Sequence, residues 1–221
     1  QGYSSAASDV YKRQAQTVPP CTLEITDAET FARDWTVIDV NSDVSANTWA
    51  YNDGNAMYMQ DKSNAADDWL IAPAVTLEAG KAYKVSAYVK HSSTFGSDKQ
   101  KIELKIGTAP TVEGLTTRLV YDESFQSRLF VEKSGTFSPA ESGVFYVGLR
   151  CYSESYNGDL YFQKIVIEEA PVYPAQITDL SIVAGERGAM SATLSWTWPS
   201  SDHLGGALSN LLGAKIYRGT D

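Results

Sequence analysis

One short stretch of the sequence, residues 39–43, has side chains that could bind a metal ion. Asp39, Asn41 and Asp43 alternate with other residues, and oxygen-bearing side chains in a loop can converge on a hard cation such as calcium. The stretch is not a complete EF-hand loop, because Val44 replaces the turn glycine and Ala50 replaces the bidentate carboxylate. It therefore predicts either a structural calcium site completed from elsewhere or a solvated turn rich in Asp and Asn.

Four tyrosines lie among Asn, Gly, Ser and Asp in predicted turns and could form a sugar-binding site. Aromatic rings stack on sugar rings while neighbouring polar groups bond the hydroxyls. The same tyrosines could instead pack at the loop bases of a β-sandwich with their hydroxyls in water. Whether they converge depends on the fold. The candidate ligand-binding residues are Tyr51, Tyr58, Tyr152 and Tyr156.

Nothing in the sequence indicates catalysis. The two histidines, His91 and His203, fall in different predicted units, so a nucleophile and its base would have to meet across a linker. His91 ends a predicted strand and is interpreted as a solvated loop residue. No Gly-rich phosphate loop and no paired-histidine zinc motif occurs. We therefore expect a protein that is not an enzyme.

The two cysteines, Cys21 and Cys151, lie at opposite ends of the first predicted unit. They could form a disulfide between the first strand and a late one, or remain two buried free thiols. Zinc-ligand spacing is absent.

Composition and charge limit the possible partners. The chain has 27 acidic and 18 basic residues, so its net charge of −9 repels nucleic-acid phosphates, and no Lys/Arg cluster offsets this locally. No apolar run approaches the ~20 residues of a membrane-spanning helix. The hydrophobic share of 43% is enough to build a globular core. We expect neither nucleic-acid binding nor membrane insertion.

The elements that must position these residues are strands. From Trp35 onward, short runs rich in Val, Ile, Tyr, Thr and Phe are separated by turn residues, which predicts an all-β fold. Apolar and polar residues alternate in several of these runs, and Asp67 and Asp68 are interpreted as leading into a buried strand. A two-sheet antiparallel β-sandwich accounts for the strands predicted at 81–90, 101–107, 128–132, 143–152 and 160–168.

A second unit is predicted after residue 169. Segment 170–175 contains Pro171 and Pro174 and is interpreted as an interdomain linker. Three more strands are predicted at 177–183, 192–198 and 214–218. Because a sandwich needs more strands than that, we expect 176–221 to be an incomplete, flexible unit with Trp196 at its core position.

Residues 1–16 are predicted to be a non-native tail or the remnant of a signal peptide. Residues 8–14, SDVYKRQ, resemble the translation of a transposon-end adapter used in DNA library preparation, which implies that residues 1–14 are not native and that the chain is a metagenomic fragment. Residues 15–17, AQT, resemble the small-residue end of a secretory signal, which implies export.

Residues 17–169 resemble the choice-of-anchor J or cleaved adhesin family. The matching motifs are DWTVID at 34–39, Trp49, DDWLIAP at 67–73 and GKAY at 80–83. The resemblance implies a jelly-roll β-sandwich from exported proteins of Gram-negative anaerobes, including the adhesin regions of gingipain-type proteases. Some relatives carry structural calcium held partly by acids in the last strand, where this chain has Gln163 and Lys164. That difference weakens the calcium interpretation.

Residues 174–221 resemble a fibronectin type III domain, an immunoglobulin-like β-sandwich of which only the first three strands would be present. The matching motifs are ITDL at 177–180, ATLSWTWP at 192–199 and IYR at 216–218.

Together these features predict a non-catalytic, secreted or cell-surface adhesion or carbohydrate-binding module of a multidomain bacterial protein. Its expected partners are a glycan or an extracellular host protein, and other domains of the same polypeptide. Two alternatives remain: a purely structural spacer, and an accessory domain of a secreted protease or glycosidase whose catalytic part lies outside this chain.

Overall fold

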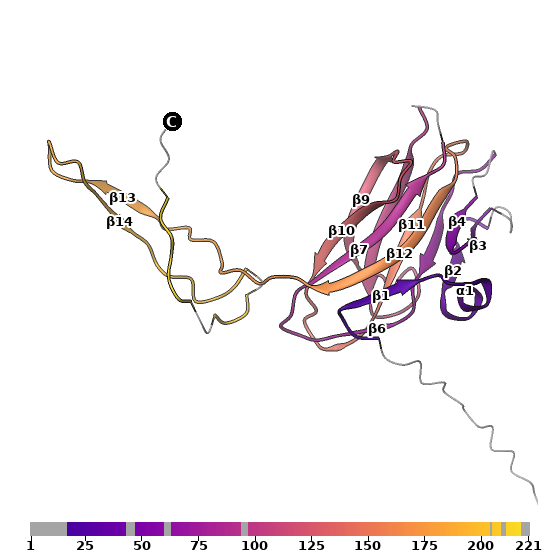
Figure 1. Ribbon diagram of the computed structural model, residues 1–221, viewed down its shortest axis with the longest axis horizontal. Helices are drawn as coiled ribbons and strands as arrows, with labels where there is room; N and C mark the ends of the chain where they lie inside the picture. The colour runs from indigo at the N-terminus through magenta and orange to yellow at the C-terminus, as the bar shows by residue number, and fades with distance from the viewer. Residues whose placement is uncertain are drawn as a thin grey trace, which may run out of the picture.

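A computed structural model describes residues 17–42, 47–59, 63–93, 97–203, 205–208 and 211–217. In the part before residue 170, two six-stranded antiparallel sheets pack face to face (Figure 1). The two-sheet sandwich predicted from the sequence is confirmed. The only helix among the described residues of this part, α1 (Ala28–Asp34), has seven residues, and no described helix is long and apolar enough to cross a membrane.

The first sheet, named here the β7 sheet, follows the order β10–β7–β12–β4–β3, and β1 also pairs with β12. All of its pairs are antiparallel. Its strands are β1 (Cys21–Glu24), β3 (Trp49–Asn52), β4 (Asn55–Tyr58), β7 (Tyr83–His91), β10 (Val131–Phe137) and β12 (Leu160–Glu169).

The second sheet, named here the β11 sheet, follows the order β2–β5–β11–β8–β9, and β6 pairs with the start of β11. Its pairs are antiparallel as well. Its strands are β2 (Thr36–Asp39), β5 (Asp68–Ile71), β6 (Val75–Leu77), β8 (Gln100–Gly107), β9 (Thr117–Phe125) and β11 (Gly143–Cys151).

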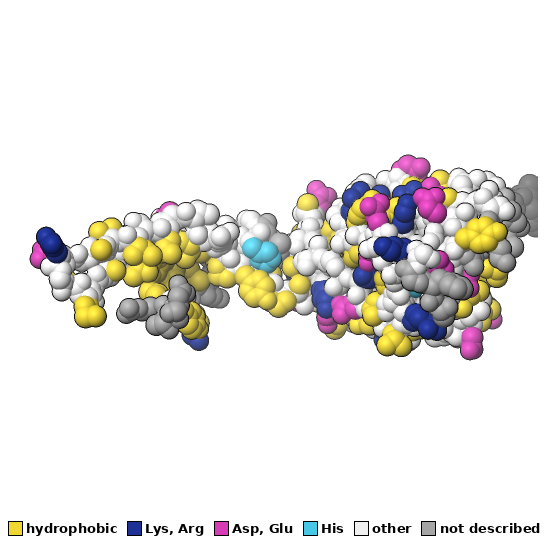
Figure 2. All heavy atoms as spheres, turned by 90° about the horizontal axis from the view of Figure 1, so that it is seen from above, with side chains coloured by type: hydrophobic (Ala, Val, Ile, Leu, Met, Phe, Trp, Pro, Cys, Tyr) yellow, Lys and Arg dark blue, Asp and Glu magenta, His cyan; other side chains and the backbone are white. Residues whose placement is uncertain are grey.

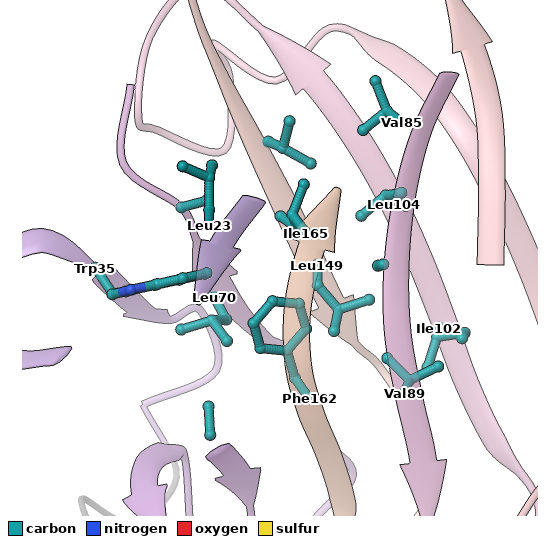
Figure 3. Packing of buried hydrophobic residues seen from close by; sticks show 14 of the residues in the cluster. Leu23, Trp35, Leu70, Val85, Val89, Ile102, Leu104, Leu149, Phe162 and Ile165 are labelled. Carbon is teal, nitrogen blue, oxygen red and sulfur yellow. The ribbon is translucent and has the colours of Figure 1, made fainter. Parts of the chain in front are cut away.

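The core lies between the two sheets, because alternate residues of each strand point to opposite faces. Figure 3 shows Phe162 and Ile165 from the β7 sheet meeting Leu70 and Leu149 from the β11 sheet. Trp35 packs edge-on against Phe162 with ring centroids 5.2 Å apart. Each of these large apolar side chains contributes about 1.5–3 kcal/mol when fully buried.

Both cysteines are free thiols. Cys21 lies in β1 of one sheet and Cys151 in β11 of the other, and each packs against the core. Of the two possibilities left open by the sequence, the structure has two unpaired thiols.

One strand was predicted at the wrong position, and two elements were not predicted. The strand predicted at 128–132 begins only at Val131, because Ser127 Oγ donates to the carbonyl of Leu129 at 2.7 Å and holds a turn there. Strand β9 was not predicted. Helix α1 was not predicted either, although Asp27 caps it by accepting the Thr30 backbone N–H at 2.8 Å.

The described part of the second unit contains a single hairpin, β13 (Ser181–Ala184) with β14 (Ala192–Ser195). The strand predicted at 177–183 starts later than expected. The strand predicted at 214–218 is absent from its described residues, 214–217, where Ile216 is 63% exposed and lies in no ladder. This unit extends from the end of β12 (Figure 1), and hydrophobic side chains gather on its surface (Figure 2).

Candidate functional site

The outer face of the β11 sheet carries a row of large polar and aromatic side chains. Strand register places Trp69, Arg150, Glu103 and Tyr121 beside one another on β5, β11, β8 and β9. Directly opposed side chains on neighbouring strands lie within contact distance. The row therefore crosses most of the sheet on the side away from the core.

Trp69 lies at the buried end of this row and is only 1% exposed. Leu115, from the loop between β8 and β9, packs on Trp69 and Ile71 in a small second cluster. The charged groups of Arg150 and Lys105 lie 5.7 and 5.4 Å from the centre of the Trp69 ring. Trp69 is thus a rigid support for the surface and is not accessible to a ligand.

Glu103 is the electrostatic centre of the row. Its side chain is only 3% exposed and is surrounded by Arg118 Nε at 2.8 Å, Arg150 Nη1 at 3.5 Å and Lys105 Nζ at 3.6 Å. A buried carboxylate is tolerated when cations and hydrogen bonds compensate for its lost hydration. Glu103 therefore fixes the two guanidinium groups in place.

Arg150 is also held from the other side by Asp67. Its Nε and Nη2 donate to the two carboxylate oxygens of Asp67 at 2.7 and 2.8 Å, and this pairing raises the pKa of Arg150. Asp68, the next residue, is fully buried at the start of β5. Both aspartates lead into the buried strand β5, as the sequence predicted.

Tyr121 and Tyr152 form the open end of the row. Their rings stack with centroids 6.1 Å apart and an interplanar angle of 23°. Arg118 Cζ lies 4.7 Å from the Tyr121 ring centre, and Arg150 Cζ lies 5.1 Å from that of Tyr152. Each ring thus already has two partners over it, which restricts how much ring face a ligand can reach.

Tyr121 and Arg118 are nevertheless exposed, with 50% of Tyr121 and 57% of the Arg118 side chain accessible. Among the described residues, the guanidinium group of Arg118 donates a hydrogen bond only through its Nε proton. The Tyr121 hydroxyl donates to Glu123 Oε1 at 2.7 Å. A ligand meets N–H donors, a carboxylate acceptor and an aromatic edge, a combination suited to hydroxyl groups.

The loop between β11 and β12 is tied to the sheet by Gln100, which is fully buried. Its Nε2 donates to the carbonyls of Asn157 and Gly158 at 3.0 and 2.5 Å. Its Oε1 accepts from Ser153 Oγ at 2.5 Å and from Cys151 Sγ at 3.3 Å. All hydrogen-bonding groups of the amide are satisfied, so the loop that follows Tyr152 is held firmly.

His91 belongs to the same buried cluster and is 2% exposed. Its Nε2 is hydrogen-bonded to the carbonyl oxygen of Asn157. The interpretation of His91 as a solvated loop residue was wrong, because strand β7 turns its side chain inward against this loop.

The four tyrosines singled out in the sequence do not form one surface. Tyr58 is only 2% exposed and packs edge-on against Trp49, so it cannot contact a ligand. Tyr51 is half-buried against the core. Tyr152 lies on the candidate surface, where burial raises the pKa of its phenol. Tyr156 is 63% exposed in the loop held by Gln100.

The residues considered for calcium are only partly described. Asp39 accepts the Ser42 backbone N–H at 2.6 Å, and Asn41 Nδ2 donates to the Ala65 carbonyl at 2.7 Å. Asp43 lies outside the described residues. In the described ranges no group of three His, Cys, Asp or Glu side chains is arranged to hold a metal ion.

Sequence reasoning missed Tyr121 of the row and its neighbour Arg118, both of which are exposed. The run Thr117–Phe125 contains Leu119, Val120 and Tyr121 and could have been interpreted as a strand. Its neighbours on the surface, Glu103 and Arg150, come from other strands and could not be inferred from local sequence.

The chain was compared with known sequences and solved structures. No family model matches the sequence, and no curated protein sequence matches it. Among solved structures, the K3 cleaved adhesin domain of Lys-gingipain from Porphyromonas gingivalis W83 has a TM-score of 0.50 at 12% identity, covering 66% of this chain and 97% of that one. The K1 domain of the same protein has a TM-score of 0.47 at 14% identity, covering 68% and 99%. The CBM22-1–GH10 modules of xylanase 10B from Clostridium thermocellum give 0.45 at 16% identity, covering 68% and 28%. The likeness to the K3 domain shows that this chain contains an adhesin-like jelly-roll fold.

Proposed function

We propose that residues 17–169 form a non-catalytic binding module of a secreted or cell-surface protein, and that its ligand is a glycan bound at the outer face of the β11 sheet. The observation that carries the proposal is the exposure of Arg118 and Tyr121 on an otherwise fixed surface. The fold shared with a cleaved adhesin domain supports the adhesion context.

The surface suits a glycan because its donors and acceptors are balanced and already ordered. Arg118 is oriented by Glu103 at 2.8 Å and by the Tyr121 ring, so little side-chain entropy is lost when it binds. Sugar hydroxyls both donate and accept, which matches the Arg118 N–H groups over the Tyr121 ring and the Glu123 carboxylate at the Tyr121 hydroxyl. Contact with the exposed edge of Tyr121 adds apolar burial.

Screening the full chain on a glycan array tests this function, followed by affinity measurements on any glycan that binds. We expect Tyr121→Ala and Arg118→Gln each to weaken binding by about tenfold or more. Arg128→Gln, at an exposed arginine in the loop between β9 and β10, is the matched control and should leave binding unchanged. Melting temperatures of the variants report whether folding is intact.

Failure to bind any glycan would favour a different role for this fold. A structural spacer has no need of an ordered polar surface. Binding that is indifferent to both Tyr121→Ala and Arg118→Gln would place the glycan elsewhere and overturn the proposed surface.

Two further assignments remain proposals. The resemblance of residues 174–221 to a fibronectin type III domain is supported by the hairpin β13–β14, in which Ile182 and Leu194 are directly opposed. A structural calcium ion near Asp39, Asn41 and Asp43 rests on the sequence pattern alone.

A further inference from the structure

The outer face of the β7 sheet carries a second continuous row, of a different character from the first. Lys90 on β7, Tyr161 on β12 and Met57 on β4 are direct neighbours in the strand register. Phe130 precedes β10, whose first residue Val131 is paired with Val89, so it lies beside Lys90. Three adjacent strands and the residue just before β10 thus contribute one half-buried row of aromatic, thioether and lysine side chains.

Lys90 is held between two rings at the middle of this row. Its Nζ lies 4.9 Å from the Phe130 ring centre and 4.5 Å from the Tyr161 ring centre. Two such contacts orient the ammonium group, but neither ring is a conventional hydrogen-bond acceptor for its N–H groups. In the described ranges Lys90 has no carboxylate or other acceptor, whereas Lys84 on the same strand contacts Glu132 at 2.5 Å.

The row is flanked by apolar side chains that face water. Leu129, next to Phe130, is 77% exposed, and Met59, two residues after Met57, is 44% exposed. Large exposed apolar groups beside half-buried aromatics are typical of protein interaction surfaces, where Phe, Tyr and Met are enriched.

We propose that this row is a second binding surface, which takes an acidic, apolar peptide segment of a partner protein with its carboxylate on Lys90. Charge complementarity selects the acidic group, because Lys90 is the cation of the row and has no acceptor among the described residues. The apolar groups select a peptide over a glycan, because Leu129, Met57 and Met59 offer a sugar hydroxyl no strong hydrogen-bond partner. A peptide buries its own apolar side chains against them.

The experiment uses the full chain as bait for a phage-displayed library of random short peptides, with affinities of the enriched peptides then measured by fluorescence anisotropy. We expect enriched peptides to combine Asp or Glu with aromatic or aliphatic residues. Lys90→Gln should weaken their binding by about tenfold. Leu129→Asp, at a position exposed enough to leave folding intact, should weaken it as much, because it repels the acidic peptide.

Two controls separate the outcomes. Lys99→Gln, at an exposed lysine just before β8, should leave peptide affinity unchanged. A glucuronate-containing oligosaccharide tests the alternative ligand class. Absence of acidic apolar peptides among those enriched, or equal affinity for the Lys90→Gln variant, would overturn the proposal. Binding of the oligosaccharide that depends on Lys90, without peptide binding, would overturn it in favour of an acidic glycan.

The two surfaces can be told apart experimentally. Arg118→Gln changes only the outer face of the β11 sheet, and Lys90→Gln only that of the β7 sheet. Loss of peptide binding in the Lys90 variant with glycan binding retained supports both proposals independently.

Discussion

Gln100 Nε2 donates a hydrogen bond to the Gly158 carbonyl at 2.5 Å, joining the first residue of β8 to the loop between β11 and β12. The same side chain also bonds Asn157, Ser153 and Cys151. One buried amide therefore links a strand to a loop that is distant in sequence.

Gln100→Leu should destabilise the fold by about 2–4 kcal/mol, because it removes the hydrogen bonds that the buried amide makes to two carbonyls and a hydroxyl. Urea unfolding of the full chain measures this free energy. Gln163→Leu, at a half-buried glutamine in the bulge of β12, is the control and should change stability by less than about 0.5 kcal/mol. Equal effects of the two substitutions would show that the Gln100 network contributes nothing specific.

Glu103→Gln should cost about 2–4 kcal/mol, since it removes the only negative charge that three neighbouring cations share at a site 3% exposed. Glu113→Gln changes an exposed glutamate in the nearby loop and should be almost neutral. Denaturant midpoints of both variants measure the change in stability. An unchanged midpoint for Glu103→Gln would contradict a stabilising role of this carboxylate among the three cations.

The Cys151 thiol should be unreactive in the folded protein. Burial raises its pKa to about 12, so at about pH 8 only about one molecule in ten thousand carries the reactive thiolate. Iodoacetamide labelling followed by peptide mass spectrometry should modify Cys151 only after denaturation. Reducing agent should leave the melting temperature unchanged, and a clear decrease would reveal a disulfide.

Calcium should raise the melting temperature slightly or not at all. Asn41 uses its amide to donate to Ala65, Asp39 accepts from the Ser42 backbone, and Gln163 replaces a possible distant acid. A site filled at a hundredfold excess over its dissociation constant would add about 2.7 kcal/mol, which thermal melting resolves easily. A large shift reversed by a chelator would show that a calcium site exists.

Amide hydrogen exchange should be fast in β13 and β14 and slow in β11. The hairpin β13–β14 leaves Ile182 and Val183 65% and 60% exposed, and an isolated hairpin is marginally stable in water. Exchange monitored by mass spectrometry on the full chain gives both rates at once. Protection of Ala192–Ser195 equal to that of Gly143–Cys151 would show that this hairpin is stabilised by contacts beyond its own ladder.

The sequence by itself determined the fold class and the inner face of the main strands. Alternation in β7 and β8 predicted which side chains would face the core. In a strand with one face on a core, apolar side chains must recur at every second position. The resemblance to cleaved adhesins predicted the jelly roll. The motifs that carry this resemblance consist largely of buried strand residues such as Trp69 and Tyr83.

The two proposed binding surfaces depend on tertiary structure. Tyr152 could be singled out from its turn, but its partner Tyr121 comes from a different strand, and Tyr58, chosen by the same reasoning, lies in the core. Strand order places Glu103 between Arg150 and Tyr121, and Lys90 between Phe130 and Tyr161. Local sequence specifies the direction of a side chain along its own strand, whereas its neighbours across the sheet depend on long-range pairing that local sequence does not encode.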